Sequence, residues 1–207
     1  MKPARDRSWR AEDQRYQRKA ERRSVILNAA LHAFLRGGYE RTSMDVIADE
    51  AGVSKMTLYR HFSDKSSLFV ECMNERCRAM LLPERYLEAK TIEEARASLV
   101  DYGHVVFELI TQEEILLLYR IFIGQVSQFK ELAVLFYNTG PVEAYHVIEK
   151  ILCRLFDADR LPLIAKTFFW ASLGDAYNRA VLGINTSEEA ESEFSQQIEL
   201  VVDSLLR

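Results

Sequence analysis

The side chains best suited to do chemistry in this sequence lie in the segment SKMTLYRHFSDK, residues 54–65. Lys, Arg, Thr, Tyr and His are residue types that hydrogen-bond to phosphate oxygens or to base edges. If Ser54 caps a helix, Leu58 and Phe62 lie four residues apart and form its apolar face. The basic and polar side chains are then left outside. This pattern favours noncovalent recognition of nucleic acid, and its alternative is a solvated helix face.

Two helices joined by a tight turn are needed to position this segment. Thr42 and Ser43 can cap the first helix, and Asp45 suits the positive end of its dipole. Gly52 tolerates the left-handed conformation that ends a helix, and Val53 turns back into the core. The side chains expected to face inward from the first helix are Val46, Ile47 and Ala51. This order of elements predicts a helix-turn-helix.

From Val25 to about Leu81 the sequence resembles the DNA-binding domain of the TetR family of transcriptional regulators. The resemblance is carried by the stretches ILNAALHAFLRGGYERTS, MDVIADEAGVS and TLYRHFSDKSSLF, which follow one another in register. It implies a DNA-binding regulator whose second motif helix enters the major groove.

The resemblance also implies which residues contact DNA. Those at phosphate or sugar are Thr42, Ser43, Tyr59, His61 and Lys65, and those at base edges are Lys55, Met56 and Thr57. Arg60 falls on a variable position of the family. Its guanidinium suits either a guanine edge or a phosphate, and both alternatives stay open.

Charge is distributed unevenly along the 207 residues, whose net charge is −4. Residues 1–23 carry nine Lys or Arg and four Asp or Glu, a net charge of +5, so the remainder carries −9. A basic arm of this kind can follow the DNA backbone or enter the minor groove, or it can be a disordered, solubilising tail. We expect a disordered arm over residues 1–21, a DNA-binding domain over 22–66 and a helical regulatory domain over 67–207.

Several other classes of protein are disfavoured. The sequence has no glycine-rich phosphate loop, no HExxH motif and no readable Ser, His and acid set, so we expect no enzyme and no cofactor. Cys72, Cys77 and Cys153 lack metal-ligand spacing, and His104 and His146 fit packed helices better than a metal site. There is no membrane-spanning apolar run and no signal peptide, so a cytoplasmic protein without a membrane partner is expected.

Helical periodicity continues beyond the motif, which predicts an all-α chain. A fourth helix is expected from Ser63 to about Leu82, closed by Pro83. Capping boxes predict helix starts at Thr91, Thr111 and Thr186, each with a glutamate three residues later. Asp159 is expected to cap the penultimate helix, with Pro162 in its first turn.

The penultimate helix, about residues 161–184, has two faces of apolar or small residues, which predicts packing on both sides. In the family, the last two helices pair with their copies in a four-helix bundle, which implies a homodimer. A fully intramolecular core is the alternative. The residues expected at the dimer interface are Phe169, Leu173, Ala176, Ala180, Phe194, Ile198, Val201 and Leu205.

Aromatic residues at helical spacing are frequent in the middle of the chain. Each of them, taken singly, is better explained by packing in the core. Ligand pockets between helices are, however, also apolar and lined by aromatic side chains. The residues expected to bind a ligand are His104, Phe107, Tyr119, Phe122, Phe136, Trp170 and Tyr177. The stretch YRIFIGQVSQFKELAVLFYNTGPVEAYHVIEKIL is similar to the AefR-like C-terminal domain of some TetR regulators.

Taken with the resemblance, these patterns imply a homodimeric repressor that binds a palindromic double-stranded DNA operator and is released by a small, mainly apolar ligand. One alternative is a dimeric DNA-binding regulator without a small-molecule effector. Another is a helical small-molecule-binding protein that has lost DNA recognition.

Overall fold

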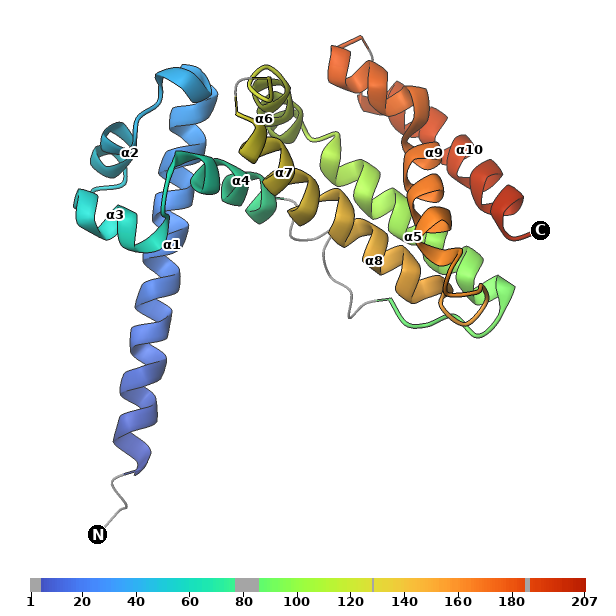
Figure 1. Cartoon of the computed structure of the whole chain (residues 1–207), viewed down its shortest axis with the longest axis horizontal. Helices are drawn as coiled ribbons and strands as arrows, with labels where there is room; N and C mark the ends of the chain where they lie inside the picture. The colour runs from blue at the N-terminus through green and yellow to red at the C-terminus, as the bar shows by residue number, and fades with distance from the viewer. Residues whose placement is uncertain (1–4, 77–85, 128, 185–186) are drawn as a thin grey trace. The chain divides into compact units, whose positions relative to one another are not determined.

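Every regular element in the part of the chain that the structure describes is an α-helix, which confirms the expected all-α fold. The structure is a computed structural model and describes residues 5–76, 86–127, 129–184 and 187–207 (Figure 1). Its helices are α1 (Arg5–Arg41), α2 (Met44–Glu50), α3 (Lys55–His61), α4 (Lys65–Arg76), α5 (Ile92–Ile110), α6 (Glu113–Ile123), α7 (Lys130–Thr139), α8 (Pro141–Leu152), α9 (Leu161–Leu182) and α10 (Ser187–Leu205). Within these ranges no helix is both long and apolar enough to cross a membrane.

The chain divides into two compact units, Met1–Cys72 and Met73–Arg207. The expected boundary was residue 66, whereas the observed one falls inside α4. The predicted end of the fourth helix near Leu82, and Pro83 after it, lie outside the described residues.

The first helix includes most of the segment that was expected to be a disordered arm. It begins at Arg5 and continues through residue 21 into the part that packs against the core (Figure 1). The expectation of disorder is corrected because no glycine or proline occurs from Arg5 to Arg36, and Arg, Lys, Glu, Gln and Ala are frequent there. Gly38, with a φ of 74°, interrupts the helical geometry near the end of α1.

Three aromatic rings form the centre of the first unit. Phe34 lies edge-on to Phe69 at 4.9 Å between ring centroids, and Tyr39 lies edge-on to Phe69 at 5.2 Å. The Tyr39 hydroxyl also shares a hydrogen bond of 2.8 Å with the Ser66 hydroxyl. These contacts join the end of α1 to α4, so the short helices α2 and α3 pack onto a platform with fixed geometry.

The capping boxes of the second unit had different outcomes. Thr91 caps α5 as predicted, because its hydroxyl accepts a hydrogen bond of 3.2 Å from the Glu94 N–H. The prediction for Thr111 is wrong. This residue ends α5, its hydroxyl donates to the Phe107 carbonyl at 2.7 Å, and α6 begins two residues later at Glu113.

Two further helix starts were predicted. Arg160, and not Asp159, occupies the N-cap position of α9, and no side chain caps it. Its backbone is already helical, with φ of −89° and ψ of −24°, so Asp159 lies one residue too early to serve as the cap. Pro162 does lie in the first turn, as predicted. Thr186 lies outside the described residues.

The core of the second unit contains most of the residues predicted for the dimer interface. α9 and α10 lie side by side (Figure 1) and also pack on α5. Six of the eight predicted residues are at most 7% exposed within their own chain: Phe169, Leu173, Ala176, Ala180, Phe194 and Ile198. Their assignment to a dimer surface is corrected, because packing between the helices of their own chain already buries them. Val201 and Leu205 are partly buried against the same core.

Gly174 interrupts α9 with φ of 49° and ψ of −147°. The side-chain amide of Gln197 in α10 donates to the Ala171 carbonyl beside this break. A Cβ atom added at Gly174 would lie 1.9 Å from the Gln197 Nε2. The positive φ therefore requires glycine, and any side chain at this position would also displace the Gln197 amide.

Gly174→Ala should lower the free energy of unfolding by about 1–3 kcal/mol, because alanine in this backbone region is strained. Gly124→Ala is the matched control, since Gly124 has a φ of −64° and an added Cβ would meet nothing closer than 3.5 Å. Urea denaturation followed by circular dichroism measures both. Equal stabilities of the two variants would contradict this account of Gly174.

Candidate nucleic-acid interface

Ser43 and Thr42 have different roles at the start of α2. The Ser43 hydroxyl caps the helix by accepting a hydrogen bond of 3.2 Å from the Val46 N–H. Thr42 is buried, and its hydroxyl lies 3.1 Å from the Ala33 carbonyl and 2.7 Å from the Gly38 carbonyl. Its predicted phosphate contact is therefore corrected, because its one donor is already used inside the protein. Thr42 instead joins the end of α1 to the start of α2.

The turn between α2 and α3 has the expected geometry. Gly52 has a φ of 63°, and the Val53 N–H donates to the Ala48 carbonyl at 3.0 Å. The inward face of α2 differs in part from the prediction, because Val46 is 44% exposed. The buried side chains of α2 are Met44, Ile47 and Ala48.

Helix α3 is anchored at both ends. The Ser54 hydroxyl accepts a hydrogen bond of 3.2 Å from the Thr57 N–H, and it shares one of 2.9 Å with the Thr57 hydroxyl. Leu58 and Phe62 are buried, as their four-residue spacing predicted. Thr57 is only half-exposed and its hydroxyl belongs to the cap, so it is less available for a base edge than the residues around it.

Four side chains of α3 point away from this core. Lys55 and Tyr59 lie four residues apart, as do Met56 and Arg60, so all four share one side of the helix. Met56 is 82% exposed and Tyr59 is 45% exposed. We call these four residues the outer face of α3. An apolar side chain as exposed as Met56 gains nothing from water, whereas it would gain from contact with a thymine methyl group.

Lys55 forms an ion pair with Asp45 of α2 across the motif. Its Nζ lies 2.7 Å from the nearer carboxylate oxygen, and both side chains are largely exposed. The hydrogen bond with Asp45 raises the pKa of Lys55, which stays fully charged at neutral pH. Exposed pairs of this kind are weak, so Lys55 can exchange Asp45 for a stronger acceptor on DNA.

Lys65 is half-buried at the start of α4. Its Nζ donates to the Tyr39 carbonyl at 2.9 Å and to the Glu40 carbonyl at 3.3 Å, and lies 4.4 Å from the centre of the Tyr39 ring. Burial lowers the pKa of its ammonium, and Glu40 partly opposes that effect. Two of its three donors are used within the protein, so a phosphate contact would depend on the third.

His61 lies at the end of α3, next to a basic groove. Burial lowers its pKa, and the positive charges of Arg60 and Lys19 lower it further. The groove has a volume of about 490 Å³ and lies between α1 and the end of α3. It is lined by Arg15, Arg18, Lys19, Arg22, Arg60 and His61.

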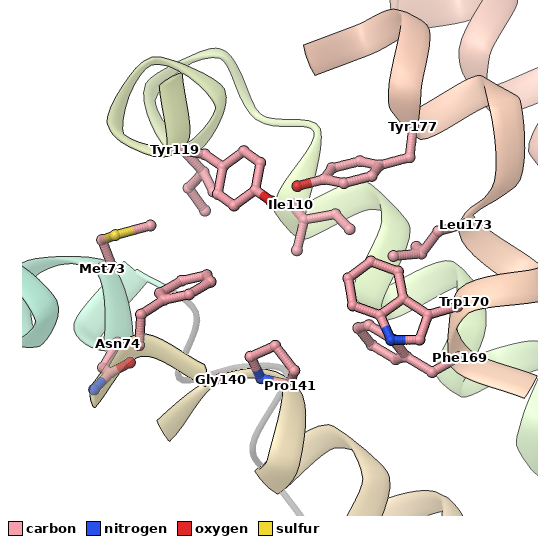
Figure 2. A pocket seen from close by; sticks show the side chains of 12 residues that line it. Met73, Asn74, Ile110, Tyr119, Gly140, Pro141, Phe169, Trp170, Leu173 and Tyr177 are labelled. Carbon is pink, nitrogen blue, oxygen red and sulfur yellow. The ribbon is translucent and has the colours of Figure 1, made fainter. Parts of the chain in front are cut away.

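A second concave site lies in the unit Met73–Arg207. Figure 2 shows the rings that surround it, with the hydroxyls of Tyr119 and Tyr177 turned toward each other. The cavity measures about 60 Å³. Its lining consists of Met73, Asn74, Ile110, Ile115, Tyr119, Phe136, Gly140, Pro141, Phe169, Trp170, Leu173 and Tyr177. Among these described residues none carries a charge.

The structure brings together four of the seven residues that were expected to bind a ligand. Tyr119, Phe136, Trp170 and Tyr177 line the cavity. Phe122 packs behind Phe136, with 4.4 Å between ring centroids.

The other two residues are placed elsewhere. His104 and Phe107 line a separate groove with Glu108 and Glu191, and Phe107 stacks on Phe194 at 4.0 Å between ring centroids. Their assignment to the same site as Tyr119 is therefore corrected, because the face of α5 that carries them is turned to α10.

Comparison with known proteins agrees with this geometry. Residues 26–72 match the family described as "Bacterial regulatory proteins, tetR family". Residues 97–207, more than half of the chain, match the "AefR-like transcriptional repressor, C-terminal domain". The chain belongs to the TetR family.

Its TetR relatives include the "HTH-type transcriptional regulator AcrR" of Shigella flexneri, which is 32% identical over 148 residues. That match covers 69% of this chain and 67% of AcrR. The "HTH-type transcriptional activator FasR" of Mycolicibacterium smegmatis is 52% identical over 50 residues, covering 24% of this chain and 23% of FasR. Both relatives are transcriptional regulators, in agreement with the expectation that the chain is not an enzyme.

Two solved TetR-type structures share the fold. A putative TetR-family regulator from Mesorhizobium loti is 25% identical, has a TM-score of 0.72, and covers 91% of this chain and 96% of its own. The "Flavonoid-responsive Regulator FrrA" is 28% identical, with a TM-score of 0.69 and coverage of 90% and 96%.

The basic groove of this TetR regulator was missed in reasoning from the sequence. Arg15, Arg18 and Arg22 recur at intervals of three and four residues, which places them on one side of a helix. That signal was present, but it has meaning only once the arm is known to be helical. Nothing in the sequence pairs it with the end of α3.

Proposed function

We propose that the protein is a homodimeric repressor that binds an inverted-repeat operator and releases it when a small, mainly apolar ligand occupies the cavity of the second unit. The observation that carries this proposal is the outer face of α3. A helix whose buried side is fixed by Leu58 and Phe62, and whose free side presents Lys55, Met56 and Tyr59, is suited to the major groove. The same face argues against a protein that has lost DNA recognition.

The side chains of the outer face of α3 suit two kinds of DNA contact, base edges and phosphates. Lys55 and Met56 lie in the first turn of α3, the part of a recognition helix that reaches base edges. Lys55 suits the acceptors of guanine, and Met56 suits a thymine methyl group. Tyr59 lies one turn later, where its hydroxyl suits a phosphate oxygen.

The dimer would use the outer side of α9 and α10, opposite the buried residues first predicted for it. Apolar side chains remain exposed there: Leu163 at 70%, Leu182 at 63% and Leu200 at 66%. A symmetric dimer formed through this surface would match an operator with twofold symmetry, whose half-sites lie about one helical turn, roughly 34 Å, or a multiple of it apart.

The ligand class follows from the cavity lining. A site with aromatic walls, two tyrosine hydroxyls and no charged side chain among its described residues suits an uncharged molecule that is mainly apolar. The name of the related FrrA describes a response to flavonoids, which are flat aromatic compounds. This likeness supports an aromatic ligand for the present chain.

The size of the cavity favours a second candidate function. Its 60 Å³ is less than the roughly 150 Å³ of a cavity known to hold benzene, so a ligand must displace side chains to enter. A cavity of this small size is what a dimeric DNA-binding regulator without a small-molecule effector would have. Release of the operator by an uncharged aromatic compound, and its loss in variants of the cavity wall, distinguishes a ligand-responsive repressor from a regulator without an effector.

Selection of bound duplexes from a random library tests the proposed function. The protein should enrich a motif with twofold symmetry, and the mass of the complex should correspond to two chains per duplex, or to a multiple of two. Lack of enrichment at low salt would contradict DNA recognition. Enrichment of a single asymmetric half-site by one chain would contradict the dimer.

A further inference from the structure

The groove between α1 and the end of α3 is a strongly basic concave surface. Five of the six side chains that line it are Arg or Lys, and no acidic side chain is among them. The arginines and the lysine are exposed, so their guanidinium and ammonium groups are open to a partner. At neutral pH the lowered pKa of His61 leaves the positive charge of the groove to these five residues.

Arg23, which is next to Arg22 on α1, has a structural role and differs in this from the arginines of the groove. Arg23 forms an ion pair with Glu71 of α4 and lies 4.8 Å from the centre of the Phe62 ring. Arg23 thus links α1 to α3 and α4, and it is absent from the groove lining. Charges held together without an acid repel one another, so the groove favours an anion that would relieve this repulsion.

We propose that this groove binds the phosphates of the DNA backbone that flanks each half-site, with α1 lying along the strand beside the recognition helix. This inference rests on the proposed DNA-binding function and deepens it. It assigns Arg60 to phosphate, and it gives a binding role to the helical arm that extends α1.

The dimensions of the groove fit a strand better than a single ion. Arg15 and Arg22 are seven residues apart, about 10 Å along a helix. More than one phosphate of a strand fits within that length, because successive phosphates advance about 3.4 Å along the duplex axis. A free phosphate ion would meet only part of such a row.

The groove is also continuous with the outer face of α3. Arg60 belongs to both surfaces, because it lies on the exposed side of α3 and also lines the groove. When the first turn of α3 lies in the major groove, its last turn approaches the backbone that borders it. The Arg and Lys side chains of α1 then continue the same line of positive charge.

The test compares the full chain with the double variant Arg18→Gln/Arg22→Gln. Affinity is measured over a series of salt concentrations for the selected operator and for an unrelated duplex of equal length. Glutamine keeps a high helix propensity, and circular dichroism verifies that the helix content is unchanged. The matched control is Lys90→Gln/Arg160→Gln, which removes two exposed charges from the other unit.

The variant should bind both duplexes at least about tenfold more weakly and keep the selected motif, because phosphate contacts carry little sequence information. The slope of log affinity against log salt should fall by roughly 0.9 for each lost contact, or about 3.6 for two contacts in each of two chains. The control should retain the wild-type slope. Equal slopes for the variant and the wild type on both duplexes would overturn the proposal.

Two further outcomes distinguish binding of the DNA backbone by the groove from binding of a free polyphosphate and from the proposed operator function. Inorganic tripolyphosphate is titrated in place of DNA. Tight binding that the variant loses, together with an unchanged DNA slope, would show that the groove holds a free polyphosphate and would overturn the assignment to DNA. A wild-type chain that selects no motif would defeat the proposed operator function alone, because the slope on the unrelated duplex still tests the groove.

Discussion

Lys55→Ala should lower the affinity for the selected operator about 100-fold, because the dimer loses two symmetric contacts and each base contact is worth roughly a factor of ten or more. Affinity for an unrelated duplex should change far less. Tyr59→Ala should weaken operator binding as well, but its effect should be shared by the unrelated duplex, since we assign Tyr59 to the backbone. Fluorescence anisotropy with labelled duplexes measures each affinity.

Two control variants make this expectation specific. Val25→Ala removes an exposed apolar side chain from α1 outside the outer face of α3 and should leave both affinities unchanged. Asp45→Asn removes the ion-pair partner of Lys55, so operator affinity should be retained or increase. If Asp45→Asn lost as much affinity as Lys55→Ala, the ion pair itself would be the required feature, and direct reading by Lys55 would be wrong.

Removal of the cavity walls should separate ligand response from DNA binding. Trp170→Ala and Tyr177→Ala should retain operator affinity while losing release by an uncharged flavone, a probe of the uncharged aromatic class that the cavity lining suits. A ligand shifts the DNA-bound population only through its differential affinity for the two states. A 100-fold release therefore requires about 2.7 kcal/mol of coupling, and operator DNA must weaken flavone binding by the same factor.

Val134→Ala is the control for the cavity, because Val134 is 61% exposed on α7 and is absent from the cavity lining. It should respond to flavone as the wild type does. Calorimetric titration of flavone with and without operator tests the reciprocity. If the wild type binds no flavone or other uncharged aromatic compound, or binds it without any change in operator affinity, the regulator without an effector is the better account.

Local hydrogen bonding explains which parts of the fold could be predicted from the sequence. Thr91 and Thr111 each precede a glutamate by three residues, yet only Thr91 caps a helix. Thr111 instead ends α5, and its hydroxyl donates to the Phe107 carbonyl one turn earlier in that helix. A capping pattern indicates only that a helix can begin at a residue. Where the preceding helix ends depends on how that helix packs.

The recognition motif could be predicted because its signals are local. Ser43, Gly52 and Ser54 act through bonds to residues within a few positions of themselves. Thr42 illustrates the limit, since its buried hydroxyl is within hydrogen-bond distance of the Ala33 carbonyl, nine residues away. The basic groove depends on α1 meeting α3 across nearly forty residues of sequence, so the local spacing of the arginines on α1 does not show that they lie beside Arg60.

The two-faced pattern of α9 indicated that it packs on both sides, but not which side meets which partner. Phe169 and Leu173 were expected to meet a second copy, and they instead pack within their own unit and line the cavity. The periodic spacing of apolar residues along α9 shows only that a face of the helix is apolar. The choice between an internal and an external partner depends on where α10 lies, which follows from the tertiary fold.

The claim that the outer face of α3 reads DNA is tested most directly by repeating the duplex selection with Lys55→Ala. We predict that the variant enriches the same inverted repeat but loses its preference at the same one or two base pairs in each half-site. Preferences at the remaining positions should persist, since the other contacts are intact. A motif unchanged at every position would contradict direct reading by Lys55 and, with it, the proposed orientation of α3 in the major groove.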